Sequence, residues 1–109
     1  MTSIEIANKI KDILGGKKAL DINILQVKDK TVLTDYFVVA TGTSSVHVKS
    51  LADEVEVKME ELFGISPKGC EGKISNSWVL LDYGDVILHI FSVESRDFYK
   101  LDSLWSGQK

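Results

Sequence analysis

Gly42-Thr43-Ser44-Ser45 is the tetrapeptide of this sequence whose residue types suit phosphate binding. It separates an apolar, β-favouring run from a helix-like stretch, and the free amides at a helix N-terminus attract anions. The glycine–lysine pattern of a nucleotide-binding P-loop is missing, because Lys49 lies inside the predicted helix. Anion binding by this loop is therefore left open, without a nucleotide being predicted.

Carboxylates are the second source of possible chemistry. The order strand, glycine, hydroxyls, helix also opens nucleotidyltransferases, in which converging carboxylates hold metal ions. The candidate ligands are Asp21, Asp35, Asp82 and Asp85. Asp82 and Asp85 flank a tight turn and are expected to point apart, while His47, His89 and Cys70 lack the spacing of a metal site, triad or dyad. The sequence predicts no catalytic residues, metal or cofactor, and a metal-dependent enzyme using Asp82 or Asp85 is the alternative.

Residues 78–91 predict a β-hairpin. Gly84-Asp85 stands between two β-rich runs, and type II′ turns prefer glycine at the first central position. A two-residue turn sets the register of the strands and places Trp78 opposite Phe91. Alternation then predicts one apolar core face, made by Val79, Leu81, Tyr83, Val86, Leu88 and Ile90.

The opposite face of the hairpin combines aromatic, acidic and imidazole side chains. Its members are Trp78, Leu80, Asp82, Ile87, His89 and Phe91. The mixture is too polar for comfortable burial and too apolar to be merely solvated, which is typical of a binding surface. The alternative is that a helix covers this face and leaves Asp82 at its wet margin.

The remaining patterns predict three helices and further strands. Thr2 and Glu5 have the spacing of a capping box, and Gly15-Gly16 would end that first helix. The expected strands lie at 20–25, 36–40 and 72–74; a second helix runs to Gly64, and a last one begins at Ser92 or Ser95.

Composition predicts one globular domain over residues 1–109. Hydrophobic residues make up 44% and charged residues 27%, and the single cysteine excludes a disulfide framework. No apolar run approaches the roughly 18 residues of a membrane span. We therefore expect no membrane association and a cytoplasmic, reducing setting.

Charge limits the choice of partner. Thirteen Lys and Arg against sixteen Asp and Glu give a net charge of −3, and Arg96 is the only arginine. Binding to a nucleic-acid backbone needs several cations on one surface, and arginine is favoured for phosphate recognition. The balance argues against direct sequence-specific nucleic-acid binding and favours a small molecule or a basic protein.

Three ordered motifs resemble the ribosomal silencing factor (Iojap) family. The first runs from Thr34–Val38 into Thr41–Ser45, and the second is Trp78–Phe91. The third comprises Ser95-Arg96, Phe98-Tyr99, Leu101 and Leu104-Trp105. The resemblance extends from the first helix to Trp105. Val46 stands where the family often has Arg or Gln.

The resemblance implies a non-catalytic protein. Its fold would be α/β (α+β), a mixed sheet of about five strands flanked by helices, similar to nucleotidyltransferases but without their catalytic set. The family binds the large ribosomal subunit through its fourteenth ribosomal protein and blocks joining of the small subunit, which lowers translation when nutrients are short. Members self-associate, so a homodimer is left open.

Together the hairpin pattern and the resemblance predict a docking patch for this basic ribosomal protein. We define the docking patch as Trp78, Leu80, Asp82, His89 and Phe91, bordered by Phe98, Tyr99 and Leu101. Trp78 and Phe91 would be apolar anchors, and Asp82 would accept hydrogen bonds from Lys or Arg. An adaptor for another basic protein is the remaining alternative.

Overall fold

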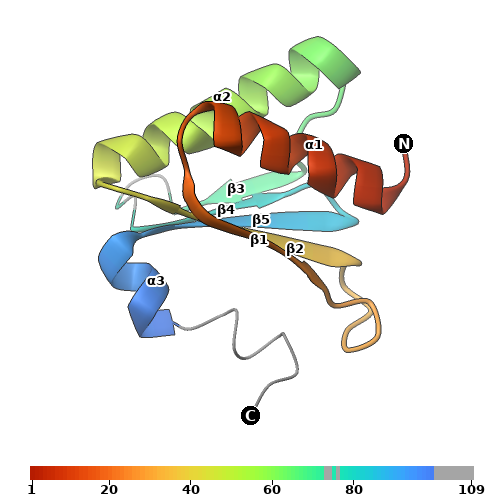
Figure 1. Ribbon diagram of the computed structural model, residues 1–109. Helices are drawn as coiled ribbons and strands as arrows, with labels where there is room; N and C mark the ends of the chain where they lie inside the picture. Colours follow the sequence, from red (N-terminus) through yellow and green to blue (C-terminus); the bar gives the residue numbers. More distant parts are fainter. Residues whose placement is uncertain (73–74, 76, 100–109) are drawn as a thin grey trace.

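The computed structural model of the chain describes residues 1–72, 75 and 77–99, and these form one sheet with helices on both faces (Figure 1). Two long helices cover one face, and a short helix lies on the other. In chain order the elements are α1 (Ser3–Gly16), β1 (Leu20–Gln26), β2 (Tyr36–Gly42), α2 (Ser45–Phe63), β3 (Gly69–Glu71), β4 (Trp78–Asp82), β5 (Val86–Ser92) and α3 (Val93–Tyr99).

The sheet is mixed and five-stranded, in the order β1-β2-β5-β4-β3, which confirms the predicted fold class. Strands β2 and β5 run parallel, and every other neighbouring pair runs antiparallel. A parallel pair needs a crossover connection. Here that connection contains α2, which packs against β2, β4 and β5.

The predicted hairpin between β4 and β5 is confirmed in register. Trp78 pairs with Phe91, Leu80 with His89, and every other pair from Val79 to Asp82 also follows the expected order. Gly84 has a φ of 88°, whereas Asp85 does not have a positive φ. This combination fits a type II′ turn, in which the first central residue alone needs a positive φ.

Helix α1 begins as predicted and ends differently. Thr2 and Glu5 form a capping box, in which the Glu5 amide donates to Thr2 Oγ1 and the Thr2 amide donates to Glu5 Oε1. The glycines at 15 and 16 remain helical, and Lys18 takes the left-handed conformation, with a φ of 64°. The Ala19 amide donates to the Leu14 carbonyl, so a Schellman motif closes the helix, and its left-handed residue lies two positions after Gly16.

The main core lies between the sheet and the helices α1 and α2. The hairpin contributes the predicted face to it, from Val79 through Ile90, and β2 adds Val38 and Ala40. A smaller cluster lies on the opposite face and contains Val27, Phe37, Val39 and Phe91. Strand β2 is therefore buried on both faces, as its apolar sequence predicted.

Strand β3 corrects one expectation. We predicted a short strand at 72–74, but the strand is Gly69–Glu71, and residues 73–74 lie outside the described part of the chain. Gly72 follows the strand with a φ of 92°, a conformation that side chains disfavour. The shift places Glu71 in the sheet.

Gly42→Ala is expected to lower the free energy of unfolding by about 1–3 kcal/mol, because overpacking forces neighbours to move. A Cβ at residue 42 would lie 2.7 Å from Val48 Cγ2 and 2.9 Å from the Val48 amide nitrogen. Gly15→Ala is the matched control, since nothing lies within 4 Å of its Cβ position, and alanine favours a helix. Urea denaturation measures both; equal effects of the two variants would contradict the prediction.

Candidate functional site

Trp78 is the centre of the docking patch in the structure. Its ring stacks on Phe91, with centroids 5.1 Å apart and an interplanar angle of 29°. Its indole Nε1–H donates to His89 Nδ1 at 3.1 Å. Since Trp78 and Phe91 are cross-strand partners, the hairpin register brings these groups together. Stacking and hydrogen bonding both orient the half-buried indole.

Two members of the docking patch are buried, which corrects their predicted role as surface groups. Phe91 is 0% exposed and His89 is 5% exposed. The cause is β2, which lies beside β5 and packs Phe37 edge-on against the His89 ring at 4.7 Å, and α3 adds contacts to both strands. Phe91 and His89 therefore support Trp78 from inside, and Trp78, Leu80 and Asp82 form the partly exposed part of the docking patch.

Asp82 ends β4 and is half-buried. Its Oδ1 accepts a hydrogen bond from the Gly84 amide at 2.8 Å, and its backbone carbonyl accepts from the Lys68 amide at 2.6 Å. The side chain thus stabilises the hairpin turn while remaining at the surface. A charge at this position has a fixed orientation, which suits recognition of a cation.

The predicted border of the docking patch is described only in part. Phe98 and Tyr99 lie in α3, whose Ser92 cap accepts a hydrogen bond from the Ser95 amide at 3.3 Å. The side chains of Phe98 and Tyr99, and the whole of Leu101, fall outside the described residues. Arg96 fastens α3 to the end of β2, because its Nη1 donates to Thr41 Oγ1 at 2.7 Å.

The His89 imidazole is neutral and has a defined tautomer. An indole N–H can only donate, so Nδ1 accepts and the proton resides on Nε2. Burial lowers the pKa of His89 from 6.5 to about 4. Nε2 is buried and has no hydrogen-bond partner within the described part of the chain, a situation that costs about 1–3 kcal/mol. An apolar residue would avoid this cost but could not accept the Trp78 hydrogen bond.

Glu71 is a residue of this surface that the sequence analysis missed. It pairs with Leu80 across β3 and β4, so both side chains lie on the face of the docking patch. Glu71, Gly72, Trp78 and Leu80 line a hollow of about 220 Å³. The alternation of residues 69–71 could have placed Glu71 on this face, but only if the strand had been predicted to end before Gly72.

The loop that resembles a phosphate cradle uses its polar groups within the chain. The Thr43 amide donates to His47 Nδ1 at 2.9 Å, and Ser44 Oγ accepts from the His47 amide at 3.1 Å. His47 Nε2 therefore carries the proton and donates to the Lys17 carbonyl at 2.9 Å, which joins the end of α1 to the start of α2. Glu94 also lines a hollow beside this loop, and its negative charge disfavours anions there.

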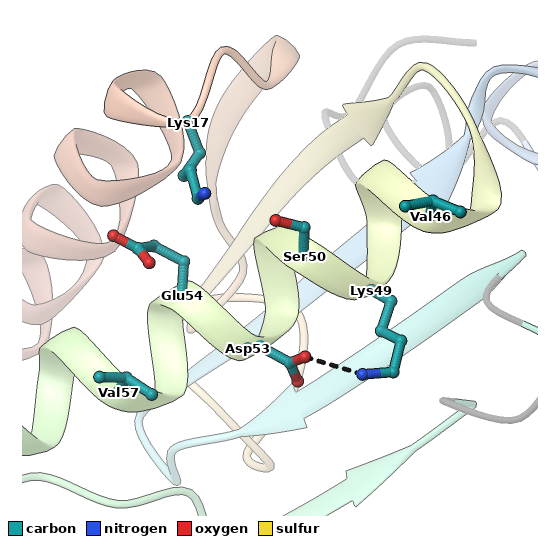
Figure 2. A pocket seen from close by; sticks show the side chains of 7 residues that line it. All are labelled: Lys17, Val46, Lys49, Ser50, Asp53, Glu54 and Val57. Carbon is teal, nitrogen blue, oxygen red and sulfur yellow. Dashed lines mark hydrogen bonds and ion pairs between the residues drawn. The ribbon is translucent and has the colours of Figure 1, made fainter.

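Another hollow lies between the end of α1 and α2, as Figure 2 shows. It encloses about 320 Å³, and its side chains carry both signs of charge. Lys49 Nζ and Asp53 Oδ2 form an ion pair at 2.9 Å there. The lining residues are Lys17, Val46, Lys49, Ser50, Asp53, Glu54 and Val57. Because positive and negative side chains balance in this hollow, it does not favour an ionic ligand of either sign.

Among the residues that the structure describes, no three His, Cys, Asp or Glu side chains gather closely enough to hold a metal ion. None of the described helices combines the length and apolar character needed to cross a membrane. Cys70, the single cysteine, lies on β3, is exposed and forms no disulfide.

These features define a class of protein: an α+β domain with one mixed sheet, two helices over one face and a half-exposed aromatic surface on the other. A family model described as ribosomal silencing factor during starvation (RsfS) matches residues 1–109. The chain belongs to the ribosomal silencing factor family, as its three motifs predicted.

Individual relatives agree with this assignment. Ribosomal silencing factor RsfS of Chromobacterium violaceum is 41% identical over 105 residues, which cover 96% of this chain and 85% of the relative. A mouse protein, mitochondrial assembly of ribosomal large subunit protein 1, is 31% identical over 86% of this chain and 42% of its own length. A crystal structure of a C. violaceum protein superposes with a TM-score of 0.93 at 40% identity, covering 100% of this chain and 90% of that one.

The titration of His89 generates a stability prediction. Between pH 6.5 and about 4 the unfolded chain binds a proton that the folded chain excludes, so the free energy of unfolding falls as the pH falls. Linkage gives a loss of about 2 kcal/mol from pH 7 to pH 5 for this group. Urea denaturation at both pH values measures it. His89→Phe, which cannot titrate there, should lose about 2 kcal/mol less; an identical pH dependence in both proteins would refute the assignment.

Proposed function

We propose that this protein is a translational repressor. It binds the large ribosomal subunit through the fourteenth ribosomal protein and blocks joining of the small subunit, which lowers protein synthesis under nutrient limitation. The observation that carries the proposal is the match of the ribosomal silencing factor model to residues 1–109. The name of the mouse relative, which refers to assembly of the ribosomal large subunit, points to the same particle.

The mechanism is steric and needs no catalytic group. A domain with principal extents of 33 × 33 × 22 Å, once bound at the intersubunit face, occupies space that the small subunit needs. The strength of such inhibition depends on the affinity and position of the bound protein and requires no catalytic turnover. We place the protein in the cytoplasm, acting on free large subunits.

The proposed contact surface is the docking patch. Trp78 supplies a rigid aromatic anchor, because Phe91 and His89 hold its ring in place before binding. Asp82 supplies a fixed carboxylate beside it. An aromatic anchor with an acidic neighbour complements a basic protein surface, and the net charge of −3 favours the same kind of partner.

Trp78→Ala is expected to weaken binding to purified large subunits by about 2–4 kcal/mol, the usual cost of removing a central aromatic anchor. A pull-down with large subunits measures the loss, with circular dichroism to verify folding. Leu62→Ala is the matched control, because Leu62 is 61% exposed on α2, over the other face of the sheet. Undiminished binding by folded Trp78→Ala protein would refute the docking patch.

Asp82→Asn separates the charge of Asp82 from its structural role. The amide oxygen can still accept from the Gly84 amide, so we expect the free energy of unfolding to change by less than about 0.5 kcal/mol. Binding should weaken by about 1–2 kcal/mol because the charge is lost. Asp82→Lys removes both interactions and should lower binding and stability together. If Asp82→Asn binds like the unaltered protein, the carboxylate is not part of the contact.

Sedimentation of a lysate through sucrose distinguishes the proposed function from its alternatives. Movement of the chain with the large subunit supports the repressor. Movement with another complex supports an adaptor for a different basic protein. Stabilisation by a nucleotide only when a divalent metal is present, measured by thermal melting, would support the nucleotidyltransferase-like enzyme and contradict the proposal.

A further inference from the structure

The hollow beside Trp78 lies at the open edge of the sheet. β3 is the last strand of the sheet, and all three of its residues are exposed. Glu71 forms one wall of the hollow, while Trp78 and Leu80 of β4 form others. The hollow therefore adjoins the partly exposed part of the docking patch and extends it toward β3.

The backbone preserves the shape of this hollow. Gly72, which also lines it, has a φ of 92°, and a Cβ there would collide with the Trp78 carbonyl oxygen. No larger residue fits this backbone, so the wall stays free of a side chain. The volume of about 220 Å³ is below the roughly 300–1,000 Å³ of small-molecule pockets and suits a single long side chain.

The chemistry of the walls selects a cation. Glu71 brings a carboxylate that makes no ion pair with any described residue, and Asp82 adds a second carboxylate on the same face. Trp78 brings an indole, which is the best aromatic ring for attracting a cation. Leu80 supplies apolar contact for a methylene stem.

We propose that the hollow receives one arginine side chain of the bound basic ribosomal protein, an inference that rests on the proposed function. The guanidinium pairs with the Glu71 carboxylate, and its stem and plane lie against Leu80 and Trp78. Arginine fits better than lysine because its planar group stacks on aromatic rings and forms bidentate bonds to a carboxylate. Glu71 is thus a specificity-determining residue of the docking surface.

The test measures binding of the full chain to the purified fourteenth ribosomal protein by isothermal titration calorimetry. Glu71→Gln should raise the dissociation constant about tenfold, and Glu71→Lys about a hundredfold, because a charge-assisted contact is lost and then reversed. The difference in dissociation constant between the unaltered chain and each variant should become smaller at high salt, because salt screens the charges. Glu61→Lys is the matched control, since it makes the same change of charge at an exposed position on α2. Both positions are exposed, so melting temperatures should stay close to that of the unaltered chain.

The outcomes separate this inference from the proposed function. If the unaltered chain fails to bind the ribosomal protein or the large subunit, the proposed function fails. A second outcome is that the unaltered chain binds while Glu71→Lys binds equally well, or loses no more affinity than Glu61→Lys. In that case the proposal that the hollow receives an arginine is wrong. Glu71→Arg, tested against single Arg→Glu and Lys→Glu variants of the ribosomal protein, should regain affinity with one Arg→Glu variant. Recovery only at a lysine position would overturn the assignment of arginine.

Discussion

Strand β5 is covered on both faces and on both edges, and the rest of the molecule is arranged around it. Its hydrogen bonds go to β2 on one side and to β4 on the other. Leu88 and Ile90 enter the main core beneath α1 and α2, while His89 and Phe91 face the smaller cluster. A strand with no free edge and no free face cannot shift its register without exposing one set of side chains. The position of Trp78 follows directly from this constraint.

The hydrogen bond between Trp78 and His89 shows how this constraint serves a surface. The His89 Nε2 atom has no hydrogen-bond partner among the described residues, and burying a polar atom in this way destabilises a fold relative to an apolar residue. The same imidazole holds the indole of Trp78 in one orientation. Ordering an anchor in advance reduces the entropy lost on binding. Stability and preorganisation are thus opposed at this position.

Polar groups elsewhere in the chain are mostly committed to structure. The loop from Gly42 to Ser45 has the residue types of an anion site, yet the Thr43 amide and the Ser44 hydroxyl bond to His47. The other ring nitrogen of His47 donates to the Lys17 carbonyl and so links the end of α1 to the start of α2. The carboxylates on the docking face differ, because Glu71 and Asp82 remain at the surface. Neither carboxylate forms an ion pair with a described residue, so the face with the aromatic anchor also carries negative charge.

The sequence by itself determined the local geometry of this protein and its family. The two-residue turn at Gly84 defined the hairpin register, hydroxyl residues defined the helix starts, and three motifs identified the ribosomal silencing factor family. These properties depend on residues close together in the chain, where backbone preferences act directly.

Only the tertiary structure decided which side chains are exposed. Phe91 and His89 were expected at the surface, but both are buried, because β2 comes from a distant part of the sequence and packs Phe37 beside them. Glu71 entered the docking face because β3 forms before Gly72, at a site chosen by pairing with β4. Burial and strand pairing are set by contacts between remote segments, which a periodic pattern in one segment does not record.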